Sequence, residues 1–124
     1  MALASTLTEN AALNGIAGVG STNQIPYVAL HVSTGPGTTG TNENANAGSY
    51  ARQACSWNAA GSGAMTNSSL LTYSTSNTVA VTYVAGWSSA TYGGGNYGIG
   101  AGLGSSVQSA SITIAIGAIS FSAT

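Results

Sequence analysis

The residues that could do chemistry are few, and several fall in one short run. Residues 49–57, SYARQACSW, contain the only cation of the protein, Arg52, its only cysteine, Cys55, and one of its two tryptophans, Trp57. Side chains alternate between the two faces of an extended strand, so Tyr50 and Arg52 would share one face and Cys55 and Trp57 the other. The sequence therefore predicts a strand with one charged face and one apolar face.

Acid, base and nucleophile candidates do not form a recognisable catalytic set. The chain has no aspartate and two glutamates, Glu9 and Glu43, so we expect no paired-carboxylate site. A cysteine nucleophile would have to combine Cys55 with His31 and a glutamate, and no motif supports that combination. We interpret His31 as a strand residue that hydrogen-bonds to a neighbour, and Cys55 as a buried, inert thiol. We predict no catalytic residue.

Metal and cofactor sites are equally unsupported. One histidine and two glutamates are too few for a metal site in one chain, so only a symmetry axis that gathers several copies of His31 could build one. Glycines alternate along residues 98–104, but Leu103 stands where the dinucleotide-binding pattern GxGxxG needs its third glycine. We interpret these glycines as a close-packed strand, and the glycosylation pattern at Asn67 as a chance match. We predict no cofactor and no metal.

Arg52 is the polar residue that we single out. Its guanidinium could form a bidentate ion pair with Glu43 or Glu9, within one chain or across a subunit boundary, or it could be a plain surface arginine. We take Arg52 and Glu43 as candidate assembly contacts. On this hypothesis, Arg52→Ala weakens assembly more than it changes the fold.

Three aromatic residues lie in or beside a glycine-rich turn: Trp87, Tyr92 and Tyr97. Aromatic rings on exposed loops can stack on sugars, so these residues are candidate glycan-binding aromatics. The alternative is that Trp87 belongs to the core and the tyrosines line a subunit contact, since Tyr and Trp are enriched at interfaces. The sequence favours this second interpretation.

Composition excludes several functions. Of the 124 residues only 2% are charged, where roughly a quarter is usual, and the net charge is −1. One arginine without any lysine cannot form the basic patch that nucleic-acid binding needs. No apolar run reaches the roughly 18 residues of a membrane-spanning helix, so we expect no membrane partner. A net charge near zero favours association, and we therefore expect a homo-oligomer.

The periodicity of apolar residues predicts one all-β domain over residues 1–124. A short helix is expected over residues 5–14, with Thr6 and Glu9 as a capping box, inside an N-terminal segment of residues 1–20. From residue 25 to residue 124, short alternating runs separated by turn residues predict an antiparallel β-sandwich or jelly roll. The expected core comprises Val28, Leu30, Val32, Trp57, Leu71, Val81, Tyr83, Trp87, Ile99, Leu103, Ile112, Ile114, Ile116 and Phe121.

An ordered series of motifs covers most of the chain. It consists of LHVSTGPGTTGTNENANAGSYARQACSWNAA (residues 30–60), VAGWSSATYGGG (residues 84–95) and GIGAGL (residues 98–103). This series resembles a family of small virion proteins of actinobacterial tailed phages, mycobacteriophages in particular, which are usually labelled tail fibre or minor tail proteins. The matching residues are Leu30, His31, Pro36, Gly37, Thr38, Thr39, Gly40, Asn42, Glu43, Tyr50, Ala51, Arg52, Gln53, Ala54, Trp57, Gly86 and Trp87.

The resemblance implies a non-enzymatic structural protein, made in the cytoplasm of the host bacterium and exposed on the virion as a tail-associated or capsid-decoration component. Its partners would be other virion proteins and further copies of itself, as a trimer or on a symmetric virion lattice. The alternative function is a carbohydrate-binding module that recognises a host-surface glycan. A groove lined by Trp87, Tyr92 and Tyr97 would support this alternative, and full burial of those rings would exclude it.

Overall fold

The computed structural model describes residues 6–18, 22–44 and 50–122, with side chains from Asn10 onward. Its elements are α1 (Thr6–Ala17), β1 (Tyr27–Val32), β2 (Gln53–Ala54), β3 (Ala64–Thr66), β4 (Leu71–Ser74), β5 (Val81–Trp87), β6 (Tyr97–Val107), β7 (Ser111–Ile114) and β8 (Ser120–Ser122). All the strand pairs among them are antiparallel. The prediction of an all-β antiparallel sandwich with a short N-terminal helix is therefore confirmed.

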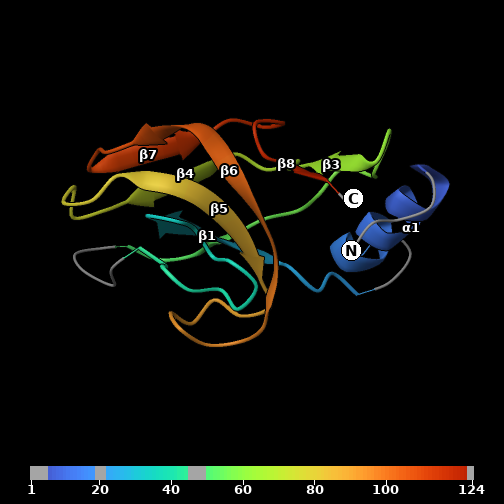
Figure 1. Cartoon of the computed structure of the whole chain (residues 1–124), viewed down its shortest axis with the longest axis horizontal. Helices are drawn as coiled ribbons and strands as arrows, with labels where there is room; N and C mark the ends of the chain where they lie inside the picture. Colours follow the sequence, from blue (N-terminus) through green and yellow to red (C-terminus); the bar gives the residue numbers. More distant parts are fainter. Residues whose placement is uncertain (1–5, 19–21, 45–49, 123–124) are drawn as a thin grey trace.

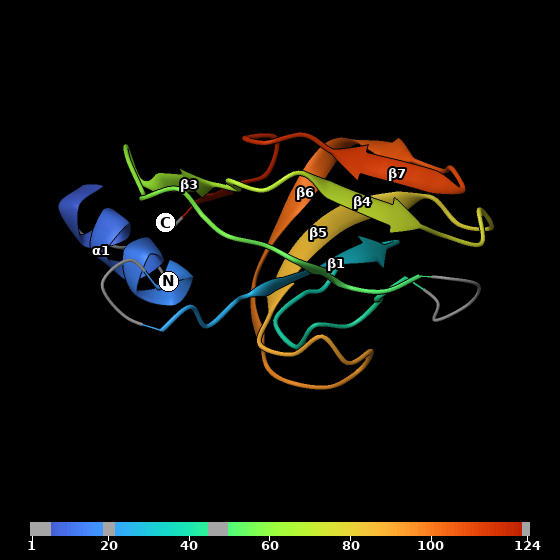
Figure 2. The same cartoon turned by 180° about the vertical axis from the view of Figure 1, so that it is seen from behind.

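The strands form one larger sheet and two strand pairs. The larger sheet has the order β2-β1-β5-β6, and the pairs are β4-β7 and β3-β8. Figure 1 and Figure 2 show the β4-β7 pair lying across the larger sheet, with α1 and the β3-β8 pair at one end of the molecule. The main core fills the space between these layers, as in other sandwiches.

Helix α1 extends three residues beyond the predicted end at Asn14. Gly15 lies inside the helix, and the helix ends before Gly18, whose φ of 84° is the left-handed conformation that commonly follows a last helical turn. Leu13 and Ala17 are buried against the main core, and the helix packs on β3 and β8. The predicted capping box depends on the side chains of Thr6 and Glu9, which lie outside the described residues.

The two faces of the larger sheet have different surroundings. On β1, Val28 and Leu30 face the main core, whereas Ala29 and His31 face the opposite side. Val81, Tyr83 and Trp87 of β5 were all expected in one core, but the register shifts between Val81 and Tyr83. Because of this bulge, Val81 lies in the main core while Ala85 and Trp87 lie on the opposite face. A second shift, between Gly86 and Trp87, likewise places Tyr97 beside Trp87.

The predicted core is correct for most of its members and wrong for a few. Ile116 is 63% exposed, and Val32, Tyr83, Ile99 and Leu103 are only partly buried. Trp87 is buried, but in a small second cluster with Ala29 and Ala85. The buried hydrophobic residues that the expected core did not include are Leu13, Ala17, Ile25, Ala29, Tyr50, Met65, Tyr73, Val84, Ala85, Ile119 and Cys55, the last of which was expected to be a buried thiol.

The run of residues 49–57 is less regular than the strand that was expected. Only Gln53–Ala54 form a strand, which pairs with the start of β1. Four side chains next to this short strand are buried. Tyr50 and Arg52 precede the strand in the chain, and Cys55 and Trp57 follow it. The alternation changes phase between Arg52 and Cys55, so the segment directs a polar pair and an apolar pair inward rather than presenting a charged face to solvent.

Candidate functional site

The clearest arrangement of polar groups lies on the face of the larger sheet away from the main core. His31 of β1 and Trp87 of β5 project from this face, and Glu43 and Arg52 meet it from the connecting segments. Tyr50 packs its ring in the main core and joins the group through its hydroxyl, which contacts Glu43. We call these five residues the Trp87 cluster. Their chain segments are far apart in sequence, so only the pairing of β1 with β2 and β5 brings them together.

Residues 33–44 lie close against this face because two glycines leave room for aromatic rings. A Cβ atom on Gly40 would lie 2.5 Å from Cη2 of Trp87, and one on Gly35 would lie 2.5 Å from Cδ1 of Tyr83. Both glycines have positive φ, 77° and 79°, which side chains other than hydrogen rarely allow. This part of the chain was expected to be a surface loop without anchors, yet Gly35 and Pro36 are buried.

Arg52 and Glu43 form a buried, bidentate ion pair. Nε of Arg52 donates to Oε2 of Glu43 at 2.9 Å, and Nη2 donates to Oε1 at 2.7 Å. The two side chains are 0% and 7% exposed. Two parallel charge-assisted bonds of this kind fix both position and orientation.

The remaining nitrogen of Arg52 holds the turn between β5 and β6. Nη1 donates to the backbone oxygens of Ser89 and Gly94, at 2.8 and 2.9 Å, so one guanidinium ties both arms of residues 88–96. The guanidinium carbon also lies 4.0 Å from the ring centroid of Trp87, in cation–π geometry. Four of the five N–H groups of Arg52 are therefore used inside the chain.

Tyr50 connects the ion pair to β1. Its hydroxyl donates to Oε2 of Glu43 at 2.9 Å and accepts from the backbone N–H of Leu30 at 3.1 Å. Burial, together with the neighbouring Glu43 carboxylate, raises the pKa of Tyr50 far above its usual value. Tyr50 is thus a neutral hydrogen-bond relay between the ion pair and the sheet.

The hydrogen bonds of His31 determine its tautomer. Nδ1 lies 2.7 Å from the backbone oxygen of Thr41, and a carbonyl only accepts, so Nδ1 carries the proton. Nε2 accepts from Nε1–H of Trp87 at 3.2 Å, and the two rings are nearly parallel at 4°. Burial lowers the pKa of His31, so the ring is neutral. The expected strand histidine with a hydrogen-bonded neighbour is confirmed, and neither nitrogen is free to act as a base.

The Trp87 cluster carries no reactive group. Glu43 already accepts from Tyr50 and Arg52, and burial raises the pKa of the Cys55 thiol to about 12, so this cysteine is protonated and inert as predicted. Within residues 6–18, 22–44 and 50–122, no three His, Cys, Asp or Glu side chains gather as metal ligands would. What the arrangement does chemically is hold two connecting segments, residues 33–44 and 88–96, on the sheet.

The structure gives the candidate assembly pair a position inside one chain. Of the alternatives left open for Arg52, a bidentate pair with Glu43 within the chain is the one observed, and a plain surface arginine is wrong. The role of Arg52 and Glu43 in assembly stays a prediction. Because both side chains are buried, any effect on assembly has to act through the segments that they hold.

The three candidate glycan-binding aromatics do not form one exposed surface. Trp87 is buried, as the favoured interpretation expected: it is 6% exposed and has Arg52 over the face of its ring. Tyr97 is partly buried and tilted against Trp87 at 5.7 Å between centroids. Tyr92 is 41% exposed and meets the ring of Tyr50 edge-on. Tyr92 and Tyr97 stay candidates, without Trp87.

Sequence reasoning missed Tyr50 and Asn67 as organising residues. Tyr50 lies two positions before Arg52, and this spacing on a strand face was the available signal. Asn67 is 0% exposed, so its side chain is inaccessible to a glycosylating enzyme, in agreement with the chance match that was expected. Its amide instead bonds to backbone groups of Ser69, Ala115 and Ile119.

A comparison with protein families gives this structure its context. Residues 3–122 match the family model described as podophage GP4 fiber I protein gp80. The chain belongs to this family. No curated protein matches the chain. Membership of the gp80 fibre family makes the protein a structural component of a phage virion, and none of the described helices is long and apolar enough to cross a membrane.

Proposed function

We propose that this gp80-family protein is a non-enzymatic unit of the phage fibre that assembles with copies of itself on the outside of the particle. The observation that carries this proposal is the position of the charged side chains. Among the described side chains, both charged groups, Arg52 and Glu43, are buried in one ion pair. Without exposed charges among these described side chains, copies have little electrostatic reason to stay apart.

Exposed apolar side chains support the same proposal. Leu70 is 59% exposed, Val79 49% and Ile116 63%, on a protein with 2% charged residues. Large apolar side chains that stay in water on a neutral surface are typical of residues covered in an assembly.

Sedimentation velocity over a wide concentration range tests self-association. The expected result is a stable oligomer, of which a trimer is one form, whose population does not fall with salt, because no exposed ion pair is involved. A protein that stays monomeric at high concentration would refute the proposal. Quantitative mass spectrometry of purified virions then separates two positions: few copies per particle fit a fibre or minor tail protein, and hundreds fit capsid decoration.

A second candidate function is recognition of a host-surface glycan by the turn between β5 and β6. The observation that favours it is that Arg52 ties Ser89 and Gly94 within residues 88–96, which presents the half-exposed ring of Tyr92 on a preorganised turn. Tyr92→Ala should abolish binding to host cell-wall glycans, with Thr91→Ala as the matched control. Equal binding by both variants would exclude this role.

The resemblance to mycobacteriophage virion proteins belongs with these proposals. It is supported by the motif series over residues 30–60, 84–95 and 98–103. Binding of the purified protein to mycobacterial cells, compared with cells of unrelated bacteria, would test it. No preference for the mycobacterial surface would count against this origin.

A further inference from the structure

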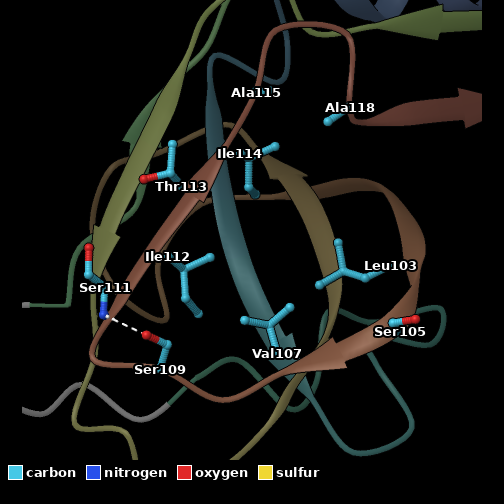
Figure 3. A pocket seen from close by; sticks show the side chains of 10 residues that line it. All are labelled: Leu103, Ser105, Val107, Ser109, Ser111, Ile112, Thr113, Ile114, Ala115 and Ala118. Atoms are coloured by element: carbon cyan, nitrogen blue, oxygen red, sulfur yellow. Dashed lines mark hydrogen bonds between the residues drawn. The ribbon is translucent and has the colours of Figure 1, made fainter.

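An apolar groove of about 630 Å³ lies among the described residues, and none of the residues that line it belongs to the Trp87 cluster. It lies between β6 and β7, and Figure 3 shows Leu103, Val107 and Ile112 pointing into the gap between the two strands. Hydroxyl side chains form its rim and no charged residue lines it. Its lining residues are Leu103, Ser105, Val107, Ser109, Ser111, Ile112, Thr113, Ile114, Ala115 and Ala118.

The backbone around the groove is also unpartnered on one side. β7 pairs only with β4 among the described strands, so its other edge faces the groove. On β6, the pairing with β5 passes from Gly102 directly to Val107, and the four residues between them have no partner in this register. An open strand edge next to an apolar gap is a typical docking place for an uncharged segment.

Directly beside the groove, one turn holds an isoleucine out in water. Ile116 is 63% exposed and lies between Ala115 and Ala118, which line the end of the groove. The turn is closed by a bond from the N–H of Ala118 to the oxygen of Ala115 at 3.1 Å. Gly117, with a φ of 80°, permits its sharp bend.

Buried Asn67 fixes this turn in place. Its Nδ2 donates to the oxygen of Ala115 at 3.0 Å, and its Oδ1 accepts from the N–H of Ile119 at 2.9 Å. The backbone oxygen of Asn67 accepts from the N–H of Gly117 at 2.9 Å. Three hydrogen bonds from a fully buried residue therefore preorganise a segment whose tip is an exposed isoleucine, an arrangement that lowers the entropic cost of binding.

We infer that the turn at residues 115–118 of one copy docks, through Ile116, into the groove between β6 and β7 of a second copy. The chain carries an apolar projection and an apolar cavity side by side, so a second copy supplies the complementary shape for each. The contact is also compatible in charge, because no charged residue lines the groove and residues 115–118 carry none, so no unpaired charge is buried on either side. The inference rests on the proposed self-association and assigns its surface.

Single lysines on either side of the contact test the inference. Ile116→Lys charges the projection, and Val107→Lys charges the groove at a position that is 39% exposed, so both variants can keep the fold. The matched control is Ala90→Lys, an exposed position in the turn between β5 and β6, which Figure 1 and Figure 2 show at the opposite side of the molecule from β7. Circular dichroism and melting temperature check that all three variants fold.

Sedimentation velocity should show oligomers for the wild type and Ala90→Lys, with association of Ile116→Lys and Val107→Lys weakened about thirtyfold or more, which corresponds to about 2 kcal/mol. A mixture of Ile116→Asp and Val107→Lys should associate more tightly than either alone, because the new charges meet across the contact. Oligomers that persist in both lysine variants would overturn this surface and leave self-association standing. A monomeric wild type would overturn both proposals.

Discussion

Glu43→Gln removes the negative charge that faces Arg52 and leaves an amide of almost the same shape. In the wild type, Nε and Nη2 of Arg52 donate to the two carboxylate oxygens at 2.9 and 2.7 Å, with both side chains almost fully buried. The amide can still accept one bond through its oxygen, but its NH₂ group faces a donor. The variant therefore buries a guanidinium without a counter-charge.

Removal of one partner of a buried ion pair typically destabilises a protein by about 3 to 5 kcal/mol. Glu43 also accepts from Tyr50, so we place the expected loss in the upper part of this range when the bond to Tyr50 is lost too. A domain of this size has roughly 5 to 15 kcal/mol of stability in total. Glu43→Gln is thus expected to remove about a quarter of it or more.

Urea unfolding followed by tryptophan fluorescence and circular dichroism measures this loss. The midpoint should fall strongly while the slope with denaturant stays the same, because the surface exposed on unfolding is unchanged. Gln24→Glu is the control: it makes the reverse chemical change on an exposed side chain and should stay within about 0.5 kcal/mol of the wild type. A Glu43→Gln variant within 1 kcal/mol of the wild type, by this measure, would refute our account of the Trp87 cluster.

The same pair allows a second comparison. The double variant Arg52→Met/Glu43→Leu removes both charges, which is often nearly neutral at buried pairs. Here we expect only partial recovery, because the backbone oxygens of Ser89 and Gly94 lose their donor. Arg52→Ala, measured for both unfolding and sedimentation, tests the assembly hypothesis: a lower stability with unchanged association would show it wrong.

Four further results are expected. Burial lowers the pKa of His31, so the folded state binds fewer protons than the unfolded state. The contribution of His31 to the free energy of unfolding is therefore complete above pH 6.5 and declines below it. His31→Gln should make the urea midpoint of unfolding depend less on pH between about pH 5 and 7.5. Gly40→Ala should destabilise more than Gly37→Ala, by about 1 to 3 kcal/mol, because both have positive φ but only Gly40 lies against Trp87; equal losses in urea unfolding would exclude the contact as the cause. Cys55 should react with a thiol reagent only after denaturation, and rapid labelling of the native protein would contradict its burial. The chain should unfold in a single transition by all probes, as one domain; separate transitions would divide it.

The sequence was sufficient for the local properties of this protein. An alternating run such as YVALHV of β1 buries one face by itself, so the all-β class and about half of the main core follow from periodicity alone. The helix at the N-terminus and its end near a glycine follow from local propensity. The inert thiol of Cys55 and the hydrogen-bonded role of His31 were also predictable, because too few partners for catalysis exist anywhere in the chain.

The faces of β5 and β6 were not predictable, because each depends on a bulge. A shift of one residue between Val81 and Tyr83 moves every later side chain to the other side of the sheet. This shift is why Trp87 leaves the main core, and the second shift, between Gly86 and Trp87, places Tyr97 beside it. An alternating pattern of apolar residues does not show where the strand register shifts, because apolar residues are buried both with and without the shift.

The contacts of the Trp87 cluster and of the turn at residues 115–118 could not be predicted from the sequence, and the reason is physical. That the chain has one arginine, two glutamates and no surplus of charge is a property of the sequence alone, and it excludes nucleic-acid binding. Which glutamate pairs with Arg52, and whether the pair is inside or outside, depends on contacts between residues about 10 to 40 positions apart. Composition determined what this protein could not do, and strand pairing alone decided which of its few polar groups meet, because only the folded backbone brings distant segments within hydrogen-bonding distance.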